Sequence, residues 1–483
     1  MAYAAVFSVL GWALIGFAGA MLLPAVVGFG YGETVLARTF AAAAGLTVFA
    51  GGALVISTRG TISLVSRREG FLLAGLAWAV LPLFGALPLY FGGVLPVATD
   101  AYFEAISALT TTGASVMTNL DGAARSVLFW RALMQWLGGL GTIMLAIALL
   151  SLLGLGGMQL YSSAMPRGEQ DSLPTRLKRS ANAIWWIYAS LTLVCAISLW
   201  LAGLPAFDAL CIAFSTLSTG GFTTRDGSIA AFDNPVAELV LVAFMLIAAL
   251  NFTLHWAAAH GRWRFYREDP EFKIIAFTTV GAVMALVAVL VLMRDDSLLA
   301  AGRSGLFLTV SFLTTTGFHG AGSGAAWPTF VPLLAIALMI VGGSTGSTAG
   351  GLKLMRLSIL FKEAGRELER LSHPHGVRRI RYGQTAVSDE AMRAVWSFFI
   401  LYVFCLVGAM VALAVLGLDT RSALVAAAAA FSNTGPAFEL ATTPGAGYGA
   451  LSGGAKWVLC LAMFAGRLEL FAVLVLLPAL WRR

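Results

Sequence analysis

The sequence contains few charged residues and few cysteines. Of its 483 residues, 11% are charged and 59% are hydrophobic, whereas soluble domains carry roughly 25% charged and about 45–50% apolar residues. This scarcity of charge excludes an ordinary soluble fold and indicates a protein of the lipid bilayer. The four cysteines include no C-x-x-C pair, so we expect buried, unpaired thiols rather than disulfides or metal ligands.

The usual signatures of an enzyme site are also missing. The sequence has no D-x-x-D, H-E-x-x-H or Ser/His/Asp grouping in a suitable context, and its five histidines lack metal-ligand spacing. The pattern G-x-x-x-x-G does occur between Gly346 and Gly351, but Leu352 and Lys353 follow it where a phosphate loop requires Lys and Ser/Thr. We therefore predict neither enzymatic activity nor a cofactor in this chain.

Long hydrophobic runs predict ten membrane-spanning segments. A spanning helix needs about 20 mostly apolar residues. The candidate runs cover 2–27, 39–57, 70–92, 126–155, 181–203, 235–258, 274–293, 328–361 (interrupted), 394–417 and 455–480. The first run follows no basic segment and is too long for a signal-peptide core, so we expect it to be retained.

The Lys and Arg residues are distributed unevenly between the connecting segments. Five of these segments hold 22 of the 31 basic residues: 58–69, 156–180, 259–273, 353–393 and 481–483. The positive-inside rule therefore predicts that both termini are cytoplasmic. The net charge of +7 is mostly this orientation signal, and nucleic-acid binding is not expected. The basic loop within 353–393 is suited to contact with membrane lipid phosphates.

Four apolar segments that are too short to cross a bilayer each end in a polar string and a glycine. They read "FEAISALTTTGAS" (103–115), "LCIAFSTLSTGGF" (210–222), "GLFLTVSFLTTTGF" (305–318) and "VAAAAAFSNTGPAF" (425–438). Aligning their glycines gives Gly113, Gly220, Gly317 and Gly435, spaced by 107, 97 and 118 residues. The residues before these glycines are small and polar: Thr111 and Thr112, Ser218 and Thr219, Thr315 and Thr316, and Asn433 and Thr434.

Each string lies between two long apolar runs, which predicts a repeated unit of long helix, short re-entrant helix, polar string and long helix. The predicted fold is all-α, with four pseudo-symmetric pore repeats around a central ion pore and two extra N-terminal transmembrane helices. The predicted domains are a helix pair at 1–69 and pore repeats at 70–180, 181–273, 274–393 and 394–483. Residues suited to cap the re-entrant helices are Asp100, Asp208, Ser304 and the pair Asp419/Thr420.

The physics of the bilayer restricts what such strings can do. Non-helical backbone at membrane depth persists only where it is buried in protein or lines a watery cavity. Four strings meeting on one axis would form rings of carbonyls that replace the hydration shell of a cation, and the negative ends of the re-entrant helices would favour that cation. The alternative interpretation is that the strings are small-residue packing contacts between helices.

The four strings resemble the selectivity filter of the Trk/Ktr/HKT superfamily of potassium transporters, and the extra helix pair is similar to the TrkH/TrkG branch rather than to KtrB. The resemblance implies that potassium is transported and is bound by the four glycines and the polar residues before them. Serine at the first position is typical of relatives that favour sodium, so Gly113 favours potassium. The fourth string departs most, with Asn433 and with Pro436 after its glycine. A sodium-selective, or sodium- or proton-coupled, transporter of the same superfamily is the alternative.

The eighth apolar run is interrupted by a string of glycines and hydroxyls that cannot hold a continuous lipid-facing helix, because each glycine costs about 1 kcal/mol relative to alanine. The string resembles the intramembrane gating loop of the superfamily; the alternative is a kink that lets helices cross closely. Its glycines and hydroxyl residues are Gly342, Gly343, Ser344, Thr345, Gly346, Ser347, Thr348, Gly350 and Gly351.

Arg467 stands near the middle of the last apolar run, where an arginine costs about 2.5–3.5 kcal/mol on insertion scales. The resemblance assigns it to the gate, with carbonyls and hydroxyls of 344–348 as acceptors. The alternative is an ion pair with Glu469.

A carrier with alternating access also uses broken helices, but its repeats are generally twofold and often inverted, whereas four parallel units favour an axial pore.

The resemblance further implies a homodimer in the bacterial inner membrane, regulated by a cytoplasmic, nucleotide-binding ring of the TrkA type.

Four acidic residues flank the strings, and they either concentrate cations at the pore mouth or are solvated loop charges: Glu104, Asp121, Asp226 and Glu439. His319 follows the third string; it either tunes that string or lies in a water-exposed loop, and we expect the exposed loop.

Overall fold

The computed structural model describes residues 3–59, 67–153, 173–320, 327–328, 330–373, 379–383, 385–440 and 447–468. Within these residues the chain is almost entirely helical. The strands found there are β1 (Arg381–Tyr382) and β2 (Thr385–Ala386), which pair antiparallel as a small hairpin. The predicted all-α class is confirmed.

The helices fall into long ones, re-entrant ones and pieces of broken spans. The long helices are α1 (Ala4–Gly30), α2 (Thr34–Ser57), α3 (Arg67–Phe91), α5 (Arg125–Leu153), α7 (Leu173–Leu201), α12 (Pro270–Arg294) and α16 (Asp389–Val415). The short helices before the polar strings are α4 (Ala98–Leu109), α8 (Ala206–Leu217), α13 (Leu298–Leu313) and α17 (Thr420–Phe431). The remaining helices are α9 (Pro235–Ala249), α10 (Phe252–Ala259), α11 (Arg264–Glu268), α14 (Phe330–Val341), α15 (Leu354–Ser372) and α18 (Gly453–Arg467).

Six helices of the described chain are long and apolar enough to cross a membrane, namely α1, α2, α3, α7, α12 and α16, and the bent pair α9 and α10 makes a seventh candidate. Helix α5 is 29 residues long, which corresponds to about 43 Å and suffices to span. Helix α14 begins the predicted interrupted run, and α18 begins the last run, whose residues beyond 468 lie outside the described part.

The sixth apolar run, predicted as one helix over 235–258, is broken. Helices α9 and α10 meet at an angle of 103°. Leu250 is extended, and the Asn251 side chain caps α10 by accepting from the backbone N–H of Thr253. An asparagine side chain accepts hydrogen bonds from the first backbone N–H groups of a helix and therefore favours a new helix start. A hydrophobicity profile does not detect this effect. The prediction of a continuous helix was wrong.

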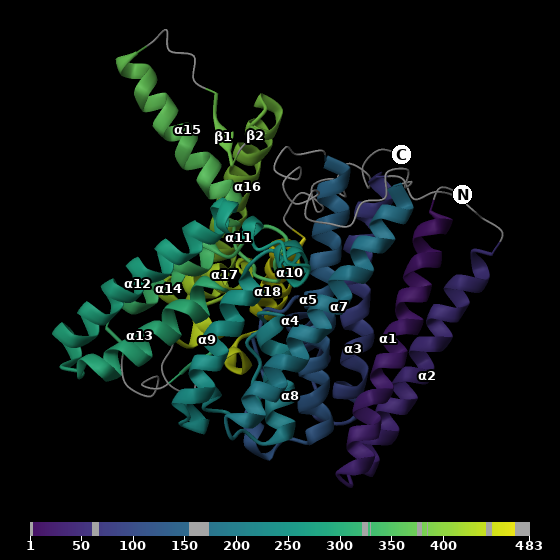
Figure 1. Cartoon of the computed structure of the whole chain (residues 1–483). Helices are drawn as coiled ribbons and strands as arrows, with labels where there is room; N and C mark the ends of the chain where they lie inside the picture. Colours follow the sequence, from purple (N-terminus) through teal and green to yellow (C-terminus); the bar gives the residue numbers. More distant parts are fainter. Residues whose placement is uncertain are drawn as a thin grey trace.

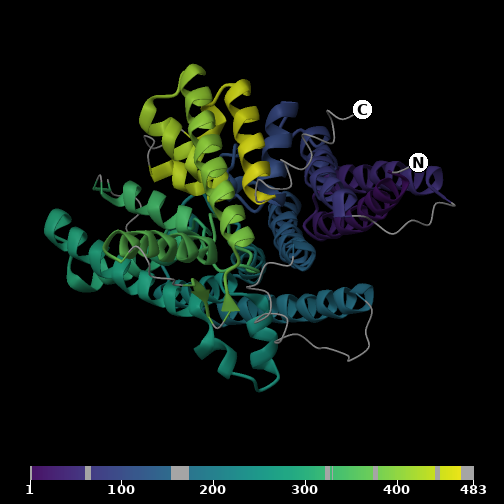
Figure 2. The same ribbon diagram turned by 90° about the horizontal axis from the view of Figure 1, so that it is seen from above.

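The helices follow one another around the molecule. Seen from above in Figure 2, the colours run in sequence order around the centre, from blue through teal and green to yellow, while the purple pair α1 and α2 lies at one edge. Figure 1 shows α15 and the hairpin projecting from the end of the molecule at which α1 begins. This circular order brings the four short helices and their strings toward a common centre.

The short helices cannot cross a bilayer. Each of α4, α8 and α17 has 12 residues, or about 18 Å, against about 30 Å of hydrocarbon. Asp419 caps α17 as predicted and accepts from the backbone N–H of Ser422; hydrogen bonds from the hydroxyl and the backbone N–H of Ser422 lower the pKa of Asp419. Ser304 was a wrong prediction, because α13 starts earlier with Ser297 as its cap. Asp100 and Asp208 were also wrong as caps, because Val97 and Pro205 occupy the cap positions of α4 and α8; the two carboxylates lie in the first turns, where a negative charge suits the helix dipole.

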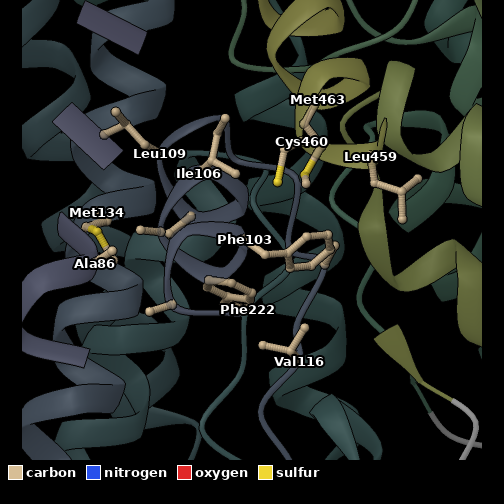
Figure 3. Close-up of a cluster of buried hydrophobic side chains, with 14 of the residues drawn as sticks. Ala86, Phe103, Ile106, Leu109, Val116, Met134, Phe222, Leu459, Cys460 and Met463 are labelled. Atoms are coloured by element: carbon tan, nitrogen blue, oxygen red, sulfur yellow. The ribbon is translucent and has the colours of Figure 1, made fainter. Parts of the chain in front are cut away.

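Buried apolar side chains hold the first short helix in place. Figure 3 shows Phe103, Ile106 and Leu109 of α4 among residues of α3, α5 and α18, including Met134 and Met463. The cysteines are unpaired, and three of the four are buried. The short helices are thus enclosed by protein, the condition under which a polar string persists at membrane depth.

Candidate functional site

Each short helix ends in the same hydrogen-bonded turn. In the first repeat the N–H of Thr112 donates to the carbonyl of Ser107 at 2.8 Å, and the N–H of Thr111 donates to Ala108 at 3.0 Å. These two bonds define a Schellman motif, which requires a left-handed residue that is usually glycine. Here the left-handed residues carry side chains, with φ between 52° and 59°: Thr111, Thr219, Thr315 and Asn433.

This turn gives the structural register of the four strings, and the register corrects one prediction. The left-handed residue is followed two positions later by Gly113, Gly317 and Gly435, but in the second repeat by Gly221. Gly221 has φ of 81°, close to 78° at Gly113 and 83° at Gly317. The alignment used the first of two adjacent glycines, Gly220, and was therefore one residue out of register in the second repeat.

The four strings form a closed ring. The N–H of Gly435 in the fourth string donates to the carbonyl of Thr112 in the first at 2.5 Å, and Asn433 Nδ2 donates to Thr112 Oγ1 at 2.9 Å. A Cβ on any of the four glycines would collide with or press on the neighbouring string: Gly113 on Gly220, Gly221 on Thr316, Gly317 on Pro436, and Gly435 on Ala114. Only glycine permits this approach of backbones.

The string 342–351 is a buried loop between α14 and α15. Its hydroxyl residues are all buried, and it is anchored at several points to the break between α9 and α10. The N–H of Ser344 donates to the carbonyl of Ala249 at 2.8 Å, and the N–H of Phe252 donates to that of Gly346 at 3.2 Å. Asn251 Nδ2 donates to the carbonyl of Thr345, so the capping residue of α10 also holds the loop.

Two further contacts tie this loop to α12 and to the third string. Glu271 of α12 is fully buried, and its carboxylate accepts from the N–H of Thr345 at 3.1 Å and from its hydroxyl at 3.2 Å. The N–H of Gly350 donates to Thr315 Oγ1 at 2.7 Å. Glu271 and Asn251 carry no distinctive signal in the sequence, because an acidic residue near a helix start and an asparagine at a break are common features of helix ends.

Arg467 lies at the end of α18 and is 3% exposed. Its Nη1 donates to the carbonyl of Thr348 at 3.0 Å, within the range of acceptors expected from the sequence. Thr348 in turn donates through Oγ1 to the carbonyls of Leu217 and Ala248 at 3.0 and 3.1 Å. The guanidinium and the loop therefore meet beside Leu217, the last residue of α8, where the second string begins. Glu469, the alternative ion-pair partner, lies outside the described residues.

The acidic residues near the strings differ in their surroundings. Glu104 is fully buried rather than at a mouth: it binds Arg131 at 2.7 Å and accepts from Ser115 Oγ and the N–H of Val116, both at 2.9 Å. It is neither a solvated charge nor free to attract cations, so both interpretations of Glu104 were wrong. A buried carboxylate is stable only when it is both paired with a cation and hydrogen-bonded, so each of these three partners is needed to stabilise the Glu104 charge.

The other three acidic residues lie nearer to solvent. Asp226 accepts from the N–H groups of Leu120 and Asp121 at 2.9 and 3.4 Å, and Asp121 pairs with Arg225 at 3.2 Å. Glu439 is exposed and lies 3.5 Å from His319 Nε2.

His319 is buried, contrary to the expected exposed position. Its Nε2 lies 3.2 Å from the carbonyl of Pro436. It is fixed by the backbone as well, since its N–H donates to Ser228 Oγ at 3.1 Å. It thus bridges the third and fourth strings.

Comparison with known proteins identifies close relatives. The TrkH family, described as "Cation transport protein", matches residues 37–480. Two proteins named "Trk system potassium uptake protein TrkH", from Salmonella typhimurium and Vibrio parahaemolyticus, are 39% and 40% identical, and both alignments cover all of each chain. The crystal structure of the potassium transporter TrkH from Vibrio parahaemolyticus superposes with a TM-score of 0.89 at 38% identity, over the full length of both chains.

Proposed function

The chain belongs to the TrkH family of cation transport proteins, a family of transporters rather than enzymes, and from this premise we propose that it takes up potassium across the bacterial inner membrane. The observation that carries the proposal is the closed ring of four glycine-bearing strings at the ends of four enclosed short helices. Potassium is the transported species, and the chain itself needs no cofactor.

In this proposal the strings are the selectivity filter. Their backbone carbonyls replace the water around potassium, and the ends of the short helices add negative potential. The register supports Gly221 as the filter glycine of the second repeat, next to Gly220. The complete filter consists of Thr111, Thr112, Gly113, Ser218, Thr219, Gly220, Gly221, Thr315, Thr316, Gly317, Asn433, Thr434 and Gly435.

The loop 342–351 and Arg467 form the gate. The loop lies against the inner side of the strings through Gly350 and Thr348, and the positive charge of Arg467 opposes a cation at that level. The glycine backbone of the loop can adopt a second conformation without steric strain, and its movement breaks the hydrogen bonds that hold it to the α9–α10 break, Glu271 and the third string. Movement of the loop away from the strings opens the path.

The topology and partners follow from the family and the charge distribution. Both termini are cytoplasmic, and the basic face formed by α15 and the β1–β2 hairpin is where a TrkA-type nucleotide-binding ring docks. Two chains form a homodimer within the membrane lipid. The domain division is the helix pair 1–69 and the pore repeats 70–180, 181–273, 274–393 and 394–483, each repeat contributing one string.

The test is uptake of radioactive rubidium into liposomes containing the purified chain, with potassium or sodium as competitor. A side chain at Gly113 collides with the backbone of Gly220, so Gly113→Ser is expected to make uptake more sensitive to sodium. Arg467→Ala removes the charge opposite the loop and is expected to raise basal uptake. Gly281→Ser, at a glycine of α12 with open space around it, is the matched control.

Wild-type uptake that potassium blocks better than sodium, with both variants shifted as stated and the control unchanged, supports filter and gate. If the wild type is silent, the assay is repeated with the regulatory subunit present. Uptake that ignores both substitutions contradicts the proposal and returns the strings to a packing role.

A further inference from the structure

Gln135 of α5 reaches from the first repeat to the backbone of the second string. It is fully buried. Its Nε2 donates to the carbonyl of Gly220 at 2.7 Å, and its Oε1 accepts from the N–H of Phe222 at 3.3 Å. One amide side chain therefore brackets Gly221 on both sides, in the manner of a neighbouring β-strand.

This bracket determines which way the carbonyl of Gly221 points. In a planar trans peptide the C=O and the N–H point in opposite directions. Because the N–H of Phe222 is directed at Gln135, the carbonyl of Gly221 in the same peptide is directed away from α5. The carbonyl of Gly220 is directed at Gln135 and is already occupied by a donor. Of the two adjacent glycines, only Gly221 presents an unbracketed carbonyl on the side away from α5.

The surroundings leave this arrangement little freedom. A Cβ at Gly220 would collide with the Gln135 amide, and a Cβ at Gly221 would collide with the carbonyl of Thr316 in the third string. One helical turn before Gln135, the guanidinium of Arg131 lies 4.0 Å from the ring centroid of Phe222. In Figure 3 that ring lies among the packed side chains of the first repeat. Two side chains of α5 thus hold the second string from behind.

We propose that Gln135 is a positioning residue of the selectivity filter: it turns the Gly220 carbonyl out of the ion path and the Gly221 carbonyl into it. The proposal rests on the proposed filter function and adds to it a determinant of cation preference that lies outside the four strings. Without the bracket, the two peptides flanking Gly221 can rotate, and the ring loses a fixed oxygen. Smaller, more strongly hydrated cations such as sodium then compete better.

The test uses Gln135→Leu and Gln135→Met, which approximate the volume and remove both hydrogen bonds. The control is Thr142→Val, at a threonine two turns further along α5 whose hydroxyl donates to Gly138 at 2.9 Å within its own helix. For each protein, the sodium and potassium concentrations that halve rubidium uptake into liposomes are measured. We expect the ratio of the half-inhibitory sodium concentration to the half-inhibitory potassium concentration to fall about tenfold in both Gln135 variants and to stay unchanged in the control. A tenfold change is the order of effect of one lost hydrogen bond to an ordered group.

A second measurement separates this inference from the function it rests on. Protection of the detergent-solubilised protein against thermal unfolding is compared in potassium and in sodium chloride, which reports cation binding without transport. A wild type protected preferentially by potassium, with Gln135 variants that lose the preference, supports the inference even where flux is low. Variants that fold and keep the wild-type preference in both assays overturn it. A wild type with no preference in either assay overturns the proposed filter itself.

Discussion

Close contact between backbones decides the role of individual glycines in this protein. Gly138 of α5 and Gly466 of α18 each face the last carbonyl of the short helix in their own repeat, Leu109 and Phe431 respectively, with no room for a Cβ. Helical propensity alone predicts that alanine stabilises such positions by up to about 1 kcal/mol. The tertiary contact reverses that sign, because a methyl group would force the short helix away from its support.

Gly138→Ala is therefore expected to lower the apparent Tm of the purified protein, with a cost of about 1–3 kcal/mol typical of overpacking. The comparison is Gly281→Ala in α12, where nothing lies within 4 Å of the added Cβ and a neutral or small stabilising effect is expected. Thermal unfolding followed by size-exclusion fluorescence measures both. Equal behaviour of the two variants would show that α5 and α4 are not in this close contact.

At the scale of elements, breaks in two neighbouring helices support each other. The α9–α10 break and the loop between α14 and α15 exchange backbone hydrogen bonds at Ser344 and Phe252, and Glu271 at the start of α12 binds Thr345 of the loop. Carbonyl and N–H groups that lack a partner within one broken helix thus form hydrogen bonds with the other break, as membrane-buried backbone requires. The 342–351 loop is consequently anchored to α12, not only to its own flanking helices.

Glu271→Gln is expected to weaken this anchor, because a carboxylate accepts two hydrogen bonds from Thr345 whereas an amide offers one acceptor oxygen and presents an N–H₂ group to the second donor. A charge-assisted hydrogen bond contributes about 1.5–3 kcal/mol, so we expect a rise in basal rubidium uptake of about tenfold. Glu268→Gln, at a carboxylate of α11 whose partner is Arg264 on the surface, serves as the control. Unchanged or reduced uptake in Glu271→Gln would contradict a holding role.

At the scale of the whole molecule, ion pairs join neighbouring repeats. In three joins of the described chain, the helix that follows a string forms an ion pair with the short helix of the next repeat. The pairs are Arg125 with Asp208 at 3.4 Å, Arg303 with Glu238 at 2.6 Å, and Lys456 with Asp100 at 2.7 Å. The last pair closes the circle between the fourth and first repeats. Such pairs help to fix the positions of three of the four short helices, α4, α8 and α13, around the axis.

Lys456→Met is expected to destabilise the closure between the fourth and first repeats. Asp100 is 23% exposed and Lys456 is 6% exposed, so the loss should stay below the about 3–5 kcal/mol of a fully buried broken pair. Adding Asp100→Asn removes the uncompensated charge and should recover part of the loss. The double-mutant cycle is measured by thermal unfolding. Additive losses would show that the two charges are not coupled.

The sequence by itself determined the class of the protein, most of its long apolar helices, the fourfold repetition of polar strings and the positions of Arg467 and the 342–351 loop. These features depend on the composition of short stretches of sequence. Bilayer insertion depends on apolar length and charge, and runs of glycine and hydroxyl residues indicate non-helical backbone. The cap at Asp419 is likewise local, since it depends on residues three positions apart.

Only the tertiary structure decided which of two adjacent glycines occupies the ring, that Glu104 and His319 are buried, that the sixth span breaks at Asn251, and that Gln135, Glu271 and the inter-repeat ion pairs hold the site. Each of these depends on contact between residues far apart in the chain, such as Gln135 with Gly220 or Glu271 with Thr345. Within the second string alone, either Gly220 or Gly221 could align with the single glycines of the other three strings. Packing against a helix from another repeat distinguishes the two, because it directs one carbonyl to a donor and leaves the next one unbracketed.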